Sequence, residues 1–200
     1  MAAGELFDEI REAYLDEIRD VYLNIYAEAI SECRKNKSVK VFAEAVFTTS
    51  DGEAIGEGPL GLPLRTDIVV VQDGVVKESF RVESELRFYF EDFSFEWKDK
   101  LLVTLSPFQW DCCQVRIFGL SESADWKPLV DWFMSNFHQS SQSDAEDDFS
   151  GVVHFVSDPE LQGECYLVEL DLGSAPVEVF GTLLDSLILV GAKSVEMGQF

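Results

Sequence analysis

The chain has 200 residues, of which 46% are hydrophobic and 12% aromatic, and its formal charge at pH 7 is −23. The apolar content excludes a disordered chain, because it can bury enough surface to offset the entropy of ordering, and the apolar runs are too short to span a bilayer. The negative charge argues against binding to nucleic acids or anionic membranes, which requires clustered lysine and arginine.

The first predicted element is a helix from about residue 5 to residue 35. Its apolar residues recur at steps of three and four and trace one helical stripe: Phe7, Ile10, Tyr14, Ile18, Val21, Ile25 and Ala29. Acidic residues crowd the start of this segment, while Arg34 and Lys35 stand at its end, as the helix dipole favours. We expect this helix to cover a hydrophobic core.

The middle of the chain is rich in predicted strands. A strand over 39–48 is followed by a glycine-rich loop, and two further strands are joined at Asp73-Gly74, a dipeptide typical of tight hairpin turns. Alternation of apolar and polar residues then predicts more strands. The predicted strands after the loop are 67–72, 75–84, 86–90, 93–97, 101–105 and 114–118. Together they resemble an antiparallel meander.

Helical and strand patterns return in the last third of the chain. A helix is predicted from an N-cap at Ser123 to Phe137, with a buried stripe that includes Trp126, Leu129 and Phe133. Residues 139–148 are polar, carry four acids and lack periodicity, so we expect a mobile loop. The remainder predicts strands over 151–156 and 165–171, a helix over 175–190 and a strand over 193–197.

These elements predict an α+β fold. An antiparallel-dominated sheet is expected to pack against the long N-terminal helix and further helices, with a β-β-α-β unit at the C-terminal end. The expected organisation is a main domain over 1–138, an acidic loop over 139–148 and a C-terminal unit over 149–200 that packs on the same domain.

The sequence predicts no catalytic residue. The four cysteines are Cys33, Cys112, Cys113 and Cys165. No Cys-x-x-Cys pair exists, so they are expected to be reduced and without a metal. Cys112 or Cys113 beside Asp111 could form a nucleophilic set with His138 or His154, but nothing in the spacing fixes such a geometry. Strand alternation in Val153-His154-Phe155 instead predicts that His154 faces the solvent.

No metal site or cofactor is predicted either. The acidic run 144–148 lacks the alternate spacing and the glycine of a calcium-binding loop, and a solvated linker is the simpler interpretation. The glycine-rich segment 52–61 matches no phosphate-binding fingerprint, and its glutamates would repel phosphate. The dense aromatic residues between 88 and 110 favour a core over a ligand cavity.

The charge distribution supports the leading functional hypothesis. Residues 121–200 contain 15 acidic residues but only two basic ones, Lys127 and Lys193. We expect a cytoplasmic, non-enzymatic module that binds or inhibits a basic protein, as immunity-type proteins do, because opposite fields accelerate association. A small-molecule or lipid-binding domain and an enzyme without a readable motif are the alternatives. The predicted contact residues are Asp125, Trp132, Asp158, Glu160, Glu164 and Glu169.

In this hypothesis Trp132 is the apolar anchor, because it lies off the predicted buried stripe of its helix. Asp131 and Asp185 are further candidates for the same negative surface.

Overall fold

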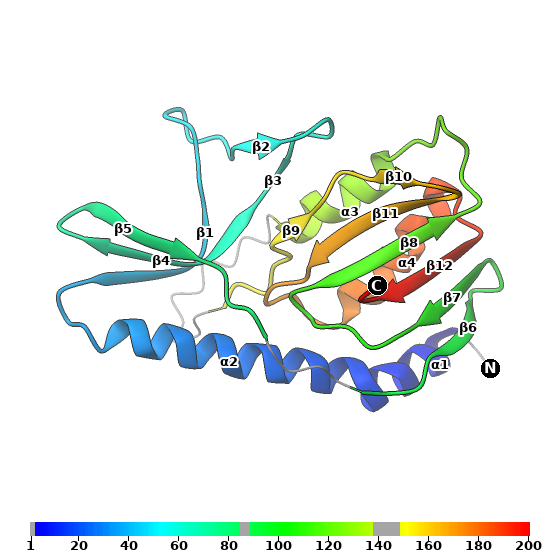
Figure 1. Cartoon of the computed structure of the whole chain (residues 1–200), viewed down its shortest axis with the longest axis horizontal. Coiled ribbons are helices and arrows are strands. Elements are labelled where there is room, and N and C mark those ends of the chain that lie inside the picture. The colour runs from blue at the N-terminus through cyan, green and yellow to red at the C-terminus, as the bar shows by residue number, and fades with distance from the viewer. Residues whose placement is uncertain (1–2, 85–88, 138–148) are drawn as a thin grey trace.

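The computed structural model describes residues 3–84, 89–137 and 149–200. A helical segment runs along one side of the molecule and consists of α1 (Ala3–Ile10), the π-helical turn η1 (Arg11–Leu15) and α2 (Asp16–Arg34) (Figure 1). The predicted N-terminal helix is confirmed. Its buried residues in α2 follow the predicted spacing of four, at Ile18, Tyr22, Tyr26 and Ile30. The π turn was not visible in the periodicity.

The largest sheet combines strands from the middle and the end of the chain. Its strands are β6 (Phe93–Trp97), β7 (Leu101–Leu105), β8 (Cys113–Phe118), β9 (Phe155–Val156), β10 (Glu160–Gln162), β11 (Cys165–Asp171) and β12 (Ser194–Gly198). The order is β10-β11-β8-β12-β7-β6, and β9 pairs with β11. Helices α3 (Lys127–Phe137) and α4 (Glu178–Val190) lie behind this sheet in Figure 1.

The α+β class is therefore confirmed, but the order of strands differs from a simple meander. The last strand, β12, lies between β7 and β8, parallel to β7 and antiparallel to β8. Side-chain alternation gives the faces of a strand and carries no information on its neighbours. The C-terminal segment thus contributes strands to the same sheet as the middle of the chain.

One face of this sheet packs against helices α3 and α4 in the core, and the other face is at least partly exposed to solvent. Val115 and Ile117 of β8 and Val168 and Leu170 of β11 are buried, and they lie with Leu129, Leu183 and Leu187 of the two helices around one apolar spot. Alternate residues of the same strands, such as Gln114, Arg116 and Glu169, point to the other side and are at least partly exposed. Buried and accessible faces follow from the period of two.

A second, three-stranded sheet extends from α2. It contains β1 (Lys40–Val46), β4 (Arg65–Gln72) and β5 (Val75–Phe80) in the order β1-β4-β5. The predicted Asp73-Gly74 turn joins β4 to β5, and both of its residues have positive φ angles, 52° and 77°. In the part of the chain that connects β1 to β4, the short strands β2 (Gly56–Glu57) and β3 (Leu62–Pro63) pair with each other in a separate two-stranded sheet.

Several predicted boundaries are wrong. The strand predicted over 75–84 ends at Phe80, and only the last two residues of the segment 151–156 are a strand. Helix α3 begins at Lys127 instead of Ser123, and the Asp125 carboxylate accepts a hydrogen bond from Lys127 N at 3.0 Å. The expected loop 139–148, His138 and most of the expected strand 86–90 lie outside the described residues.

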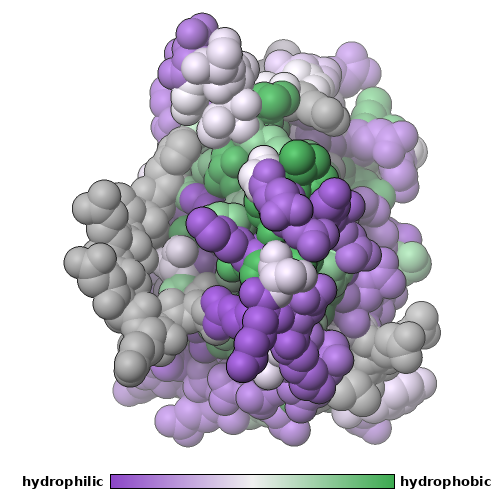
Figure 2. Space-filling model, turned by 90° about the vertical axis from the view of Figure 1, so that its left-hand side faces the viewer, coloured by the Kyte–Doolittle hydropathy of each residue, from purple (hydrophilic) through white to green (hydrophobic). Residues whose placement is uncertain are grey.

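The end of the molecule that carries β1, β4 and β5 is largely covered by hydrophilic side chains, with some hydrophobic ones between them (Figure 2). The exposed apolar residues of the three-stranded sheet are Phe42, Val75 and Val76. Among the helices of the described residues, none has the length and apolar character needed to cross a membrane.

Candidate functional site

The most unusual feature of the interior is a buried histidine–carboxylate cluster formed by Glu44, Asp67, His154 and Asp171. His154 Nδ1 lies 2.7 Å from Asp67 Oδ1, and its Nε2 lies 3.0 Å from Glu44 Oε1. The imidazole is fully buried. The prediction that His154 faces the solvent is therefore wrong, because the segment before β9 lies between the two sheets and has no exposed side.

The two carboxylates that bind the ring come from neighbouring strands. Ala43 of β1 pairs with Ile68 of β4 and Ala45 pairs with Thr66, so Glu44 and Asp67 lie opposite one another. Glu44 has a φ of 52°, which breaks the regular ladder. The Tyr26 hydroxyl of α2 takes the place of a direct backbone hydrogen bond between the two strands. It donates to Asp67 O at 2.5 Å and accepts from Glu44 N at 3.1 Å.

Backbone hydrogen bonds hold His154 at the junction of the two sheets. Its amide donates to Asp171 O at the end of β11, and its carbonyl accepts from Arg65 N at the start of β4, both at 3.0 Å. Glu44 is fixed in turn by the Ser174 hydroxyl and by Ser150 N, which donate to its carboxylate. The side chains therefore have little freedom to reorient.

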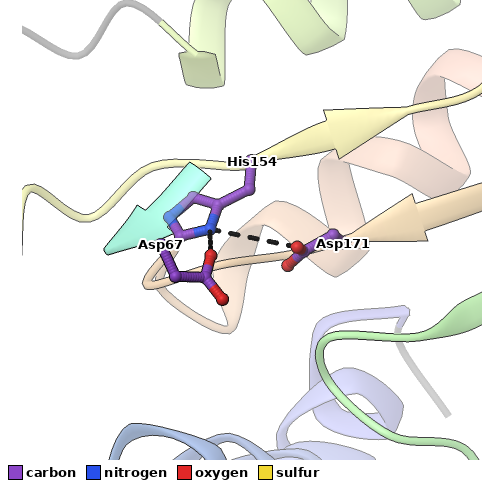
Figure 3. A group of neighbouring side chains, drawn as sticks. All are labelled: Asp67, His154 and Asp171. Carbon is purple, nitrogen blue, oxygen red and sulfur yellow. Dashed lines mark hydrogen bonds and ion pairs between the residues drawn. The ribbon is translucent and has the colours of Figure 1, made fainter. Parts of the chain in front are cut away.

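Asp171 approaches the same imidazole from a third direction. Its Oδ2 lies 3.9 Å from His154 Nδ1, and its Oδ1 accepts from Gly173 N at 2.9 Å. Figure 3 shows Asp67 and Asp171 turned toward the same nitrogen of His154. Burial disfavours the charge on Asp171 and raises its pKa, although the charge of His154 opposes this effect.

The carboxylates keep the imidazole charged. Burial alone lowers the pKa of His154, but the hydrogen bonds to Asp67 and Glu44 outweigh burial and raise the pKa to about 10. For Glu44, burial raises the pKa, whereas the hydrogen bond and charge of His154 give a net lowering. At neutral pH the ring is therefore an imidazolium that donates from both nitrogens.

A cleft of about 520 Å³ opens beside this cluster, and Asp171 forms part of its wall. The other lining residues are Arg81, Val82, Glu83, Ser84, Gln109, Asp111 and Cys112. Asp111 accepts from the amide and hydroxyl of Ser84 at 3.0 Å and 2.6 Å. Burial raises the pKa of Asp111.

The nucleophilic set considered from the sequence is not assembled with His154 in this cleft, and its alternative base, His138, lies outside the described residues. Cys112 and Asp111 both line it, but both ring nitrogens of His154 are engaged by carboxylates. Burial and then the charge of Asp111 raise the pKa of Cys112, although a hydrogen bond with Gln199 opposes them. A thiol in this environment is a weak nucleophile at neutral pH.

Three of the predicted contact acids gather on one hairpin, which we call the acidic hairpin (β10, β11 and the turn between them). Glu160 lies in β10, Glu164 in the turn and Glu169 in β11, and all three are exposed. Asp158 precedes the hairpin but is only partly exposed, because its carboxylate accepts from Leu60 N at 2.9 Å. Asp125 is exposed near the start of α3.

Trp132 cannot act as the predicted anchor, because it is only 6% exposed. Its indole N–H donates to Val179 O and to the Thr182 hydroxyl of α4. Helix α3 packs against both the sheet and α4, so its buried surface is wider than a single stripe. Asp131 and Asp185 are paired with Lys127 and Lys98. In the acidic hairpin, Leu161 is the exposed apolar side chain, at 52%.

The chain matches no known family model, no curated protein and no solved structure.

The histidine–carboxylate cluster was not predicted from the sequence. One signal was present, since Glu44 interrupts the apolar stretch 41–46 and Asp67 directly precedes the apolar run 68–71 within a predicted strand. A charged residue in the interior of an apolar strand needs a buried partner.

Proposed function

We propose that this protein is a non-enzymatic module that binds a basic protein through the acidic hairpin. The observation that carries the proposal is the position of Glu160, Glu164 and Glu169 together on one hairpin at the end of the large sheet. A concentrated negative field steers a positively charged partner and raises the rate of association.

The hairpin also offers more than charge. Strand β10 is the terminal strand of the sheet order in the described residues, so one of its sides is available to a further strand. Leu161 is exposed on β10 beside Tyr166, whose ring packs against Trp126 at 5.1 Å. By the period of two, these side chains lie on the helix-facing side of the hairpin, whereas Glu160 and Glu169 lie on its other face. The apolar group therefore borders the acidic surface at the exposed edge of β10, where it adds the apolar contact that charges alone do not supply.

The test compares two variants with equal charge changes. In the hairpin variant, Glu160, Glu164 and Glu169 are all replaced by Gln. In the helix variant, the exposed Glu12, Glu17 and Glu28 of the N-terminal helical segment are replaced by Gln. Each variant is immobilised and exposed to lysate of the source cells at ionic strengths of about 0.01 M and about 1 M, where the Debye length falls from about 30 Å to about 3 Å.

We expect the wild type and the helix variant to retain the same basic protein at low salt, and the hairpin variant to lose it. With that partner purified, the hairpin variant should chiefly lower the association rate, and the difference should shrink as salt rises. Equal losses in the two variants would show that net charge alone attracts the partner. Retention of no basic protein at low salt would also reject the proposal.

A further inference from the structure

The histidine–carboxylate cluster contains more buried carboxylates than one imidazolium neutralises. Glu44, Asp67 and Asp171 surround His154, and each is no more than 3% exposed. Arg65 is nearby, but its guanidinium donates to the backbone carbonyls of Glu44 and Phe137. Buried carboxylates without sufficient positive charge are costly, and an additional cation relieves that cost.

Three potential ligand atoms converge on one position in this cluster. One atom each from Asp67, His154 and Asp171 lie within 4.8 Å of one another. Ligands of a tetrahedral metal ion at bond lengths of about 2.0–2.1 Å lie roughly 3.3 Å apart. His154 Nδ1 lies 2.7 Å from Asp67 Oδ1 and 3.9 Å from Asp171 Oδ2. A small lengthening of the first distance and a small shortening of the second would therefore accommodate an ion.

The surroundings of His154 match those of a metal-ligating histidine. Such a histidine usually donates its second ring N–H to a carboxylate, which fixes the orientation of the ring. Glu44 occupies that position at Nε2, and it is itself held by Ser174 and Ser150. Nδ1 is the nitrogen directed at both Asp67 and Asp171 (Figure 3).

An independent observation comes from Tyr22. Its hydroxyl is buried, with 1% of the residue exposed, and it has no hydrogen-bond partner among the residues that the structure describes. The Tyr22 ring packs against the ring of Tyr26 at 5.7 Å, and the Tyr26 ring lies 6.2 Å from that of His154. Burial raises the pKa of Tyr22, and the charges of Asp171, Asp67 and Asp111 raise it further. A buried hydroxyl left without a partner is unfavourable, and an ion with its bound water would satisfy it.

We propose that Asp67, His154 and Asp171 form a binding site for a divalent transition-metal ion, with Glu44 as the carboxylate that orients His154. A site of one nitrogen and carboxylate oxygens suits ions such as Zn²⁺ or Mn²⁺. When the ion binds, the Nδ1 proton leaves to solvent and Nε2–H continues to donate to Glu44. The cleft along Asp171 provides the path of entry.

The experiment measures metal binding by the full chain after treatment with EDTA and desalting. ZnCl₂ and MnCl₂ are titrated separately by calorimetry at constant pH, and retained metal is counted by mass spectrometry after dialysis. The variants are Asp171→Asn, which removes a ligand, and Glu44→Gln, which removes the orienting charge. Cys112→Ser and Asp111→Asn are controls in the same cleft, because they test adventitious binding by the exposed thiol and its neighbour.

We expect one ion per chain, loss of binding in Asp171→Asn, and an affinity about 10- to 100-fold lower in Glu44→Gln. Cys112→Ser and Asp111→Asn should retain the ion. The proposal is overturned if the wild type retains no metal, or if Cys112→Ser loses it while Asp171→Asn keeps it. If Asp171→Asn does not fold, Tyr22→Phe decides, since an unchanged affinity in this variant contradicts the site and a lower one supports it.

Discussion

Among single residues, His154 is expected to have a large effect on stability, because it is the shared partner of two buried carboxylates. Replacement by Phe preserves much of the ring volume but leaves Glu44 and Asp67 buried without their shared cation. Breaking a buried ion pair on one side typically costs about 3–5 kcal/mol. We therefore expect His154→Phe to lower the free energy of unfolding by a similar amount, measured by urea denaturation at neutral pH in the presence of EDTA.

A compensating variant provides the control for this measurement. Glu44→Gln and Asp67→Asn added to His154→Phe remove the unpaired charges, so part of the lost stability should return. A loss below about 1 kcal/mol in the single variant would show that water or neighbouring groups already satisfy the two carboxylates.

The cysteines give a second prediction for single residues, based on exposure and pKa. All four are free thiols, and of these Cys112 is exposed whereas Cys113 and Cys165 are buried. Burial raises the pKa of both Cys112 and Cys113, so the reactive thiolate is scarce at neutral pH. We expect iodoacetamide to modify Cys112 well before Cys113, and the Cys112 rate to rise about tenfold per pH unit below its pKa.

Peptide mass spectrometry of the alkylated protein measures both rates, and the chain unfolded in urea is the reference in which the four thiols become similar. Equal rates for Cys112 and Cys113 in the folded chain would contradict the burial of Cys113.

The candidate site illustrates what a sequence pattern omits. Alternation around His154 predicts one exposed side for the segment, but it cannot show that Val153 and His154 are both covered at the junction of two sheets. The same limit applies to Trp132, because a helical stripe describes one buried face and α4 provides another. The exposed acids Glu160, Glu164 and Glu169 were easier to predict, since charged residues without buried partners remain in solvent.

At the scale of elements, the turn after β11 fixes the position of His154. Gly173 has a φ of 55°, and a Cβ added there would collide with the His154 ring and lie 2.5 Å from Val152 O. Gly163, in the turn between β10 and β11, has a similar φ of 64°, but no atom of the described part of the chain lies within 4 Å of an added Cβ. Alanine at position 163 would therefore cause backbone strain alone, whereas alanine at position 173 would cause both backbone strain and a steric clash.

We expect Gly163→Ala to cost about 1–2 kcal/mol, the price of a left-handed alanine, and Gly173→Ala to cost about 1–3 kcal/mol more, because it overpacks the cluster. Thermal and urea unfolding of both variants measure the difference. Similar losses would indicate that His154 can shift without penalty.

The elements also differ in how far the sequence determines them. The N-terminal helix and the Asp73-Gly74 hairpin depend on local chemistry, namely periodic burial and residues that tolerate positive φ. The insertion of β12 between β7 and β8 depends on long-range pairing and leaves no local trace. Likewise, β10 is a short strand of exposed residues, and it has no pattern of buried side chains to reveal it.

At the scale of the whole molecule, the charge of −23 predicts how stability responds to salt. Like charges repel one another more strongly in the compact state than in the expanded chain. The opposing ion pairs, such as Lys127–Asp131 and Lys35–Glu32, lie at the surface, where each contributes only about 0–1 kcal/mol. Repulsion should therefore dominate, and its screening should stabilise the fold.

We expect the unfolding temperature to rise as NaCl increases from about 0.01 M to about 0.15 M, because the Debye length falls from about 30 Å to about 8 Å, and to change less above that range. Scanning calorimetry of the wild type measures the rise. The helix variant with three glutamates replaced should show a smaller increase, since it has less repulsion to screen. An unfolding temperature that falls with salt would instead show that the surface ion pairs outweigh the net repulsion.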